Sequence, residues 1–339
     1  LSAMILLTGA TGFLGSHVLY KLLQNGEKVR ATKRATSSLE NVNRVFRFYG
    51  EDKIALLEKV EWIDADLLDV FTVEDAVKGI DEIYHCAAVV SFNPKDKEAM
   101  LQINARGTEN LVNAALEAGV KKFCHVSSIA ALGRNTTKDI VTEKIWWKPS
   151  PKNSDYSVSK YQAEREVWRA SEEGLNVVIV NPSVIIGPGD FSSGAYKMMQ
   201  QAYKGIPFYT DGATAFVDVR DVADAMINLM KSDVKNERYI VSAANVSYRY
   251  FFDLLHDAFG KKLPSIKANK TIVKLTSYVD KFKSVLTGKE YVITADAVNA
   301  VSSAHQYDNS KLIKKLGIKY IPITQSAKEM CEVFLKYQF

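Results

Sequence analysis

The stretch Met4-Ile-Leu-Leu-Thr-Gly9-Ala-Thr-Gly12-Phe-Leu-Gly15 decides the fold of this 339-residue chain. It begins with an apolar, strand-like run, and residues 16–24 that follow it have a helix-like pattern. A sharp turn from strand to helix leaves unpaired N–H groups and the positive end of the helix dipole facing one point. Since glycine has no Cβ, a diphosphate can approach the backbone there. The stretch predicts an anion-binding turn, while an ordinary glycine-rich turn stays an alternative.

The bulk composition indicates a globular protein that binds a small molecule. Hydrophobic residues make up 47% of the chain and charged residues 24%, and the net charge of +5 is spread along it. Such a mild charge favours an anionic small molecule over nucleic acid. No run approaches the ~18 apolar residues of a membrane span, and no secretory signal is recognisable. The five histidines and three cysteines follow no metal spacing, so we expect no metal site and free thiols in the cytoplasm. We expect a monomer or homodimer.

Strand-like and helix-like segments alternate through the first half of the chain. This alternation predicts an α/β fold with a doubly wound, Rossmann-type parallel sheet, and ligands at the carboxyl ends of its strands. We expect a dinucleotide-binding domain over residues 1–182, with returns from 215–245, and a smaller, mostly helical substrate lobe over 183–339. The expected strands are Met4–Thr8, Lys28–Lys33, Val60–Asp64, Glu82–Cys86, Lys122–Ser127 and Asn176–Asn181, and the expected helices lie near 13–25, 70–79, 96–119 and 156–174.

The end of the second strand bears on the choice of cofactor. An NAD site has an acidic residue there, which binds the ribose 2′-hydroxyl. This strand instead ends in Lys33-Arg34, and no carboxylate follows until Glu40. Guanidinium and ammonium groups pair with a 2′-phosphate, so the sequence favours NADP(H), with NAD(H) possible. Arg34 is the better candidate and Lys33 assists it, while a solvated basic strand end is the alternative.

A tyrosine followed four residues later by lysine occurs three times, at Tyr49, Tyr156 and Tyr307. Only Tyr156 opens a predicted helix, which puts Lys160 one turn away on the same face. Only Tyr156 also follows a Ser-Ser pair, Ser127-Ser128, at the end of a buried strand. We therefore interpret Tyr156 and Lys160 as functional, and the other two pairs as surface loops.

Together these motifs resemble an extended short-chain dehydrogenase/reductase of the NAD-dependent epimerase/dehydratase family. Further matches are Asp66-Leu67, His85-Cys86-Ala87-Ala88, Asn104 in Asn-x-x-Gly-Thr, the run Asn181 to Pro188, and Phe216 to Ala223. The run Val29 to Arg34 is most similar to the dihydroflavonol 4-reductase and aldehyde/ketone reductase branch. The resemblance extends from Met4 to about Ala225. It departs at Asn41, where the branch often has a second cation.

The resemblance implies a role for each matching residue. Tyr156 would give a proton to a carbonyl oxygen, Ser128 would hydrogen-bond the developing oxyanion, and Lys160 would lower the pKa of Tyr156 and reach the cofactor ribose. Asn104 would hold a water or a helix kink in a proton relay, or it is a helix-surface amide. Asp66 would accept from the adenine amino group, or it is a helix N-cap, as we also interpret Asp221. The expected cofactor-binding set is Gly9, Thr11, Gly12, Phe13, Leu14, Gly15, Lys33, Arg34, Asp66, Leu67, Ala87, Ala88, Val89, Tyr156, Lys160, Pro182, Ser183 and Val184.

The residues expected around the substrate are apolar and aromatic, which favours a small apolar or aromatic aldehyde or ketone. They are Phe92, Ser128, Ile129, Tyr196 and Phe208, with Phe191, Met199 and Tyr203 as further candidates that core packing would equally explain. We therefore predict an NADPH-dependent carbonyl reductase. The alternatives are a nucleotide-sugar epimerase, a 3β-hydroxysteroid-type dehydrogenase, and a non-catalytic NADP-binding scaffold or redox sensor. Residues 272–286 have an amphipathic helical pattern, which fits a packed helix, a lid or a membrane-surface contact.

Overall fold

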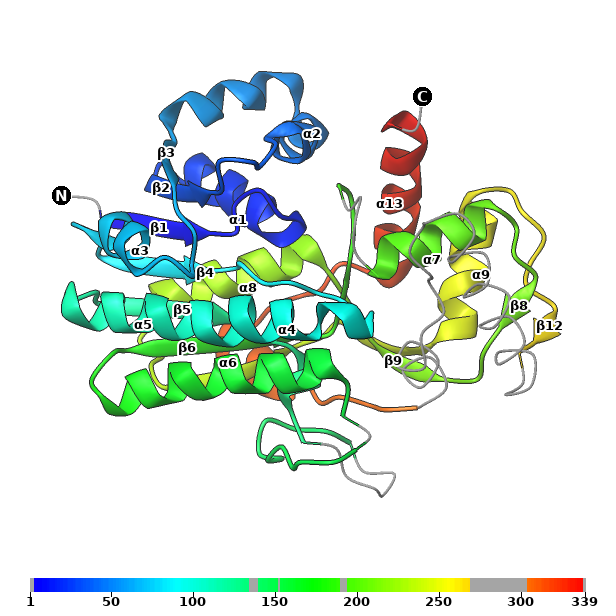
Figure 1. Cartoon of the computed structure of the whole chain (residues 1–339). Coiled ribbons are helices and arrows are strands. Elements are labelled where there is room, and N and C mark those ends of the chain that lie inside the picture. The colour runs from blue at the N-terminus through cyan, green and yellow to red at the C-terminus, as the bar shows by residue number, and fades with distance from the viewer. Residues whose placement is uncertain (1–2, 134–139, 152, 190–193, 269–303, 338–339) are drawn as a thin grey trace.

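The computed structural model describes residues 3–133, 140–151, 153–189, 194–268 and 304–337. Its larger lobe contains a seven-stranded parallel sheet with strand order β10-β6-β5-β4-β1-β2-β3 (Figure 1). The order reverses between β1 and β4, so a ligand crevice is expected at the carboxyl ends of these two strands. The strands are β1 (Met4–Thr8), β2 (Lys28–Lys33), β3 (Glu61–Asp64), β4 (Glu82–His85), β5 (Lys122–Val126), β6 (Val177–Pro182) and β10 (Glu237–Val241).

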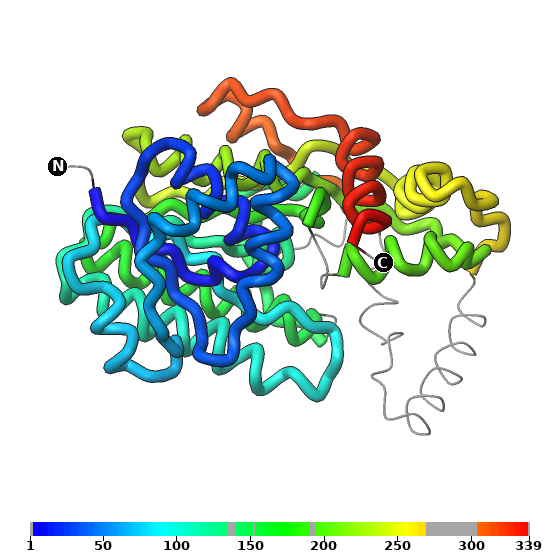
Figure 2. Tube along the Cα trace, turned by 90° about the horizontal axis from the view of Figure 1, so that it is seen from above, coloured from blue at the N-terminus to red at the C-terminus, as the bar shows by residue number. Residues whose placement is uncertain are grey.

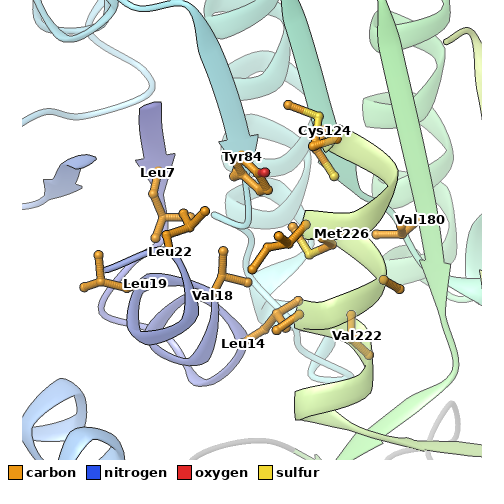
Figure 3. Close-up of a cluster of buried hydrophobic side chains, with 14 of the residues drawn as sticks. Leu7, Leu14, Val18, Leu19, Leu22, Tyr84, Cys124, Val180, Val222 and Met226 are labelled. Carbon is orange, nitrogen blue, oxygen red and sulfur yellow. The ribbon is translucent and has the colours of Figure 1, made fainter. Parts of the chain in front are cut away.

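Side chains alternate across this sheet and form a core on each face. Leu6, Ile83 and Phe123 lie in the core under helices α3 (Val70–Val77), α5 (Gly107–Glu117) and α6 (Asp155–Glu172). Their strand neighbours Leu7, Tyr84 and Cys124 lie in the opposite core, under α1 (Phe13–Gln24) and α8 (Val219–Lys231) (Figure 3). Burial on both faces explains why the strands are apolar throughout. The sheet is therefore a Rossmann-type α/β layer structure.

The smaller lobe has its own core, in which Met199, Phe216, Phe251 and Phe334 pack together. A three-stranded sheet of order β11-β9-β7 and a two-stranded pair, β12-β8, accompany its helices. The remaining elements are β7 (Val184–Ile186), β8 (Phe208–Tyr209), β9 (Ala213–Asp218), β11 (Ala244–Ser247), β12 (Ile266–Lys267), α2 (Glu40–Tyr49), α4 (Lys97–Met100), α7 (Gly194–Tyr203), α9 (Tyr248–Ala258), α12 (Ser310–Leu316), α13 (Ile323–Tyr337), the 3₁₀ helices η1 (Glu51–Lys59), η2 (Pro94–Asp96) and η4 (Ile129–Ala131), and the π-helical η3 (Leu101–Arg106). Within the described residues, no helix is both long enough and apolar enough to span a membrane.

The C-terminal helix α13 stands between the two lobes (Figure 2) and is fixed by buried charge. Asp218 caps α8 by accepting from the Arg220 N–H, and it also accepts from the Ser326 hydroxyl of α13 at 2.6 Å. Arg220 pairs with both Asp218 and Glu329 of α13. The interpretation of Asp221 as the N-cap is thus wrong, because Asp221 lies one turn inside and accepts from the Ile321 N–H.

Three features differ from the sequence predictions. The sequence did not indicate α2 and η1, which connect β2 to β3. Tyr49 ends α2 and is not in a surface loop, because its ring stacks on Tyr20 and its hydroxyl bonds the His17 ring at 2.6 Å. Tyr307 is likewise buried and pairs with Val141. The expected amphipathic helix at 272–286 and Phe191 lie outside the described residues.

Two buried histidines lie side by side on β4 and β5, with ring centroids 5.3 Å apart. His85 hydrogen-bonds the hydroxyls of Thr8 and Thr108, at 2.7 and 2.9 Å. Neither ring nitrogen of His125 has a hydrogen-bond partner. Burial lowers the pKa of His85 to about 3, and it lowers the pKa of His125 well below its usual range. Both rings are therefore neutral at pH 7.

We predict that these histidines make the protein acid-sensitive. The unfolded chain binds protons below pH ~6.5 that the folded rings do not take up, so stability falls as the pH drops from about 6.5 toward 4. His125→Leu removes one such ring without breaking a hydrogen bond. It should leave the free energy of unfolding at pH 7 nearly unchanged. The decrease in this free energy between pH 7 and pH 5, as measured by urea denaturation, should be smaller than in the wild type.

His85→Leu is the matched comparison. It should flatten the pH dependence in the same way, but cost about 1–3 kcal/mol at pH 7, because two buried threonine hydroxyls each lose one hydrogen bond. An equal cost of both substitutions at pH 7 would contradict the assignment of His125 as unpartnered.

Candidate active site

The glycine turn brings β1, α1 and β4 into backbone contact. Gly9 has a φ of +71° and packs on Ala87, where a Cβ would lie 2.6 Å from the backbone nitrogen. A Cβ on Gly15 would lie 2.0 Å from the carbonyl oxygen of Gly9. Helix α1 begins at Phe13 after Gly12, with no side-chain cap and no acidic residue in its first turn. Its first N–H groups are therefore available to an anion, as a dinucleotide diphosphate requires.

The two predicted cations at the end of β2 differ in their ion pairing. Lys33 forms an ion pair with Asp64 at 2.5 Å, whereas the exposed Arg34 has no ion pair among the described residues. Asn41 of α2 reaches back to the Thr11 carbonyl of the glycine turn, at 3.5 Å. Arg34 is thus the cation of this pair that is open to a ligand, and Asn41 lies beside the turn.

Asp66 and Leu67 follow β3 at the same edge of the sheet. Asp66 is exposed and accepts from the Leu68 N–H, at 3.0 Å. It does not cap α3, whose N-cap is Asp69, so that alternative is wrong. The carbonyl of Leu67 accepts from Asn110 of α5. The Asp66 carboxylate is therefore open to a ligand.

Asn104 holds the loop after β4 against α6. It is fully buried within the π-helical turn η3, and its amide exchanges two hydrogen bonds with the backbone of Val89, at 2.7 and 2.9 Å. It also donates to Ser159 of α6, at 3.0 Å. The alternative of a helix-surface amide is thus wrong. Asn104 fixes the segment from Ala87 to Val89 beside the residues between Tyr156 and Lys160.

Ser128, Tyr156 and Lys160 meet at the carboxyl end of β5. Ser128 caps η4, and its side chain hydrogen-bonds that of the half-buried Tyr156. Lys160 is buried and donates to the carbonyl of Val126, at 2.8 Å. The structure therefore assembles the three residues that the sequence singled out.

The pKa values in this trio follow from burial. Burial raises the pKa of Tyr156, and the hydrogen bond from Ser128 opposes this effect. The expected lowering by Lys160 is not found, and the Lys160 ammonium donates to the Val126 carbonyl. Burial lowers the pKa of Lys160 to about 8, against the opposing effect of Glu164. At neutral pH, Tyr156 is a protonated phenol beside a buried cation.

The region expected to hold a nicotinamide ring also has an unsatisfied polar group. Ser183 lies between Pro182 and Val184, and its N–H donates to Val241, at 3.0 Å. Its hydroxyl is buried without a hydrogen-bond partner. A buried orphan hydroxyl is uncommon in native proteins and is a candidate ligand contact. Together with the uncapped α1, it makes this edge of the sheet suitable for a nicotinamide dinucleotide.

The predicted substrate residues divide into two groups. The Phe92 ring lies 6.0 Å from that of Tyr156, and Ile129 follows Ser128 directly. Tyr196, by contrast, packs on Phe334 in the core of the smaller lobe, as Met199 and Tyr203 also do. Phe208 is half-buried in β8. Core packing therefore describes Tyr196 better than a contact with the substrate does.

The sequence did not single out two residues behind the trio. Glu164 and Arg238 form a buried ion pair at 2.9 Å between α6 and β10. The available signal was spacing, because Glu164 follows Lys160 by four residues and so shares the helix face of Tyr156 and Lys160.

Residues 5–242 match the model of the NAD dependent epimerase/dehydratase family. The chain belongs to this family. It is 32% identical to sterol demethylase protein B of Methylococcus capsulatus, over 77% of this chain and 76% of that one. It is 27% identical to the Synechocystis sp. protein named "Putative dihydroflavonol 4-reductase", over 98% and 94%. The protein in the crystal structure of gox2253 is 29% identical in sequence to this chain, over 99% of both chains, and the two structures match with a TM-score of 0.81. The chain is thus an NAD(P)-dependent enzyme of the oxidoreductase type.

We predict that a side chain at Gly15, the third glycine of the turn, lowers the stability of the protein. Gly15→Ala forces a Cβ against the Gly9 backbone, which cannot move away freely, and should cost at least about 1–3 kcal/mol. Gly12→Ala is the control, since its Cβ would lie 3.3 Å from the same oxygen. Thermal unfolding should show a clear drop for the first variant and a small one for the second. Equal drops would contradict this packing.

Proposed function

We propose that this protein is an NADPH-dependent reductase that transfers a hydride to a small apolar or aromatic aldehyde or ketone. The observation that carries the proposal is the Ser128–Tyr156 hydrogen bond beside the buried Lys160, with Phe92 against the tyrosine ring. Reduction of a carbonyl requires a proton for its oxygen. The raised pKa of Tyr156 keeps that proton in place at neutral pH.

The residues act on the carbonyl oxygen in complementary ways. NADPH supplies the hydride when it is bound. The Tyr156 hydroxyl donates its proton to the oxygen as negative charge develops there. Ser128, which already hydrogen-bonds Tyr156, donates to the same oxygen and stabilises that charge. Lys160 is mainly cationic at neutral pH, because its pKa of about 8 lies above 7.

A well-anchored aromatic loop supports an apolar substrate. Ser91 donates to Asp96 at 2.5 Å, and Lys97 pairs with Asp155 at 3.2 Å. Asp155 directly precedes Tyr156, so these contacts tie the segment that carries Phe92 to the start of α6. A preformed aromatic wall beside the proton donor favours a substrate with an apolar body. The dihydroflavonol named for the Synechocystis relative is in keeping with such a substrate.

The arginines that follow Pro182 argue against a nucleotide-sugar epimerase. Only three arginines follow Pro182 in the sequence. Arg220 is paired with Asp218 and Glu329, and Arg238 with Glu164. Arg249 lies over the Tyr209 ring, at 4.3 Å. Two of the three cations are already neutralised, which leaves little to clamp a sugar-bound diphosphate.

A second candidate is oxidation of a 3β-hydroxysteroid or a related sterol. The relative named sterol demethylase protein B is 32% identical over most of both chains, and a sterol is also an apolar alcohol or ketone. A scaffold without catalysis is disfavoured, since Ser128, Tyr156 and Lys160 are all present and assembled. Substrate panels therefore need to include sterols in both reaction directions.

We predict that Arg34 determines cofactor choice. Arg34→Ala should weaken NADPH binding by about 1–3 kcal/mol, through loss of a charge-assisted phosphate contact, and leave NADH binding nearly unchanged. Lys33→Ala should have the smaller effect, because Asp64 already neutralises that ammonium. Fluorescence titration of both cofactors measures this. A wild type that prefers NADH, or equal losses for both cofactors, would overturn the NADPH assignment.

We predict that kcat/KM depends on the size of an apolar substrate and that turnover requires Tyr156. Each CH₂ placed in the pocket contributes up to ~0.8 kcal/mol, so kcat/KM should rise along an aldehyde series until the pocket is full. Tyr156→Phe should lower kcat by orders of magnitude and leave NADPH binding nearly intact. NADPH consumption and calorimetry with UDP-sugars provide the measurements. A flat series with saturable UDP-sugar binding would favour the epimerase.

A further inference from the structure

We propose that Glu164 is a positioning residue of this site: its buried carboxylate is the counter-charge of Lys160 and fixes the strand end that carries Ser128. The inference rests on the proposed function, because it assigns Glu164 to the same Ser128–Tyr156–Lys160 site. Glu164 lies on α6, four residues after Lys160, and its side chain is 3% exposed.

The carboxylate of Glu164 is surrounded by hydrogen-bond donors from four elements or segments. One oxygen accepts from the Ser127 hydroxyl at 2.5 Å and from the Asn181 amide at 2.8 Å. The other accepts from the Trp168 indole at 3.2 Å and from Arg238 at 2.9 Å. A carboxylate is acceptor-only and can satisfy all four donors, whereas a glutamine amide presents an N–H₂ group to two of them. The environment therefore selects a negative charge at this position.

These contacts extend to three consecutive residues at the end of β5. The carbonyl of Val126 accepts from Lys160, and the hydroxyl of Ser127 donates to Glu164. The carbonyl of Ser128 accepts from the same Asn181 amide that donates to Glu164, at 3.1 Å. Ser128 is thus held through its own backbone carbonyl. Loss of the carboxylate releases Ser127 and Asn181 together.

Arg238 links this cluster to the chain between Ser128 and Tyr156. Besides Glu164, its guanidinium donates to the carbonyls of Glu143, at 2.6 and 2.9 Å, and Ile145, at 3.2 Å. The ion pair is nearly inaccessible to solvent, because the Arg238 and Glu164 side chains are 10% and 3% exposed. A buried pair of this kind is costly to break, because the remaining charge is left uncompensated.

The electrostatic effect of Glu164 acts on Lys160. The titratable groups that interact with that ammonium are Glu164 on α6, His85 and Cys86 at β4, and His125 on β5. Both histidines are neutral, and burial raises the pKa of the Cys86 thiol to about 12, so at neutral pH Glu164 is the anion of this set. It opposes the burial that lowers the pKa of Lys160 to about 8. Without Glu164, the pKa of Lys160 would be lower still.

The test is a titration of Lys160 in the protein without added substrate. Lysines are labelled with ¹³C at the ε-carbon, and the Lys160 signal is assigned with Lys160→Arg. Glu164→Gln should move its midpoint to lower pH by about one unit or more, as expected for loss of a nearby opposite charge. The acid limit of the pH range in which kcat is high should stay at its wild-type position. The alkaline limit of that range should move to lower pH together with the Lys160 midpoint.

Glu166→Gln is the matched control. Glu166 is also a glutamate of α6 paired with an arginine, Arg169 at 2.9 Å, but it lies nearer the surface. Its substitution should leave both the Lys160 midpoint and kcat unchanged. Glu164→Asp keeps the charge, so it should keep the midpoint close to that of the wild type and recover part of kcat.

Because Glu164→Gln leaves Arg238 unpaired, the single variant can be too unstable to titrate. Glu164→Gln combined with Arg238→Met removes both buried charges, and should regain stability while retaining the lowered midpoint. A wild-type midpoint in a folded double variant would overturn the proposal, and so would an unchanged midpoint in Glu164→Gln. Failure of the wild type to reduce any carbonyl compound would refute the proposed function and leave this titration result intact.

Discussion

The close backbone contact between Gly9 and Gly15 sets the geometry of the larger lobe. A side chain at Gly15 would overlap the Gly9 carbonyl, and one at Gly9 would overlap Ala87. The contact draws the start of α1 against the ends of β1 and β4, where the strand order of the sheet reverses. Because these three backbones meet without side chains between them, the uncapped helix start lies directly at the crevice where a dinucleotide binds in such sheets.

A second constraint is buried charge at the carboxyl edge of β5. Lys160, Glu164 and Arg238 are all nearly inaccessible to water, and each is held by specific hydrogen bonds. Desolvation lowers the pKa of Lys160 toward the working range, and the opposing carboxylate limits that effect. The same contacts fix the backbone of Ser128. Charge balance and geometry of this site therefore come from one network.

Sequence reasoning found the residues whose spacing reports a local structure. Gly9, Gly12 and Gly15 lie within one turn, and Tyr156 and Lys160 are one helical turn apart, so both patterns are visible in the chain. It was wrong about Asp221, Tyr49 and the surface alternative for Asn104. In each case the partner comes from a distant segment: Ile321 for Asp221, Tyr20 and His17 for Tyr49, and Val89 for Asn104. A local pattern carries no information about such partners.

The sequence by itself determined the α/β class, the glycine turn and the Ser128, Tyr156 and Lys160 set, because hydrophobic periodicity and short-range spacing are properties of neighbouring residues. Only the tertiary structure decided how those groups are charged. The raised pKa of Tyr156, the lowered pKa of Lys160 and the role of Glu164 all follow from burial and from contacts between α6, β5, β6 and β10. Desolvation depends on everything packed around a group, and so it is set only once the distant segments have come together.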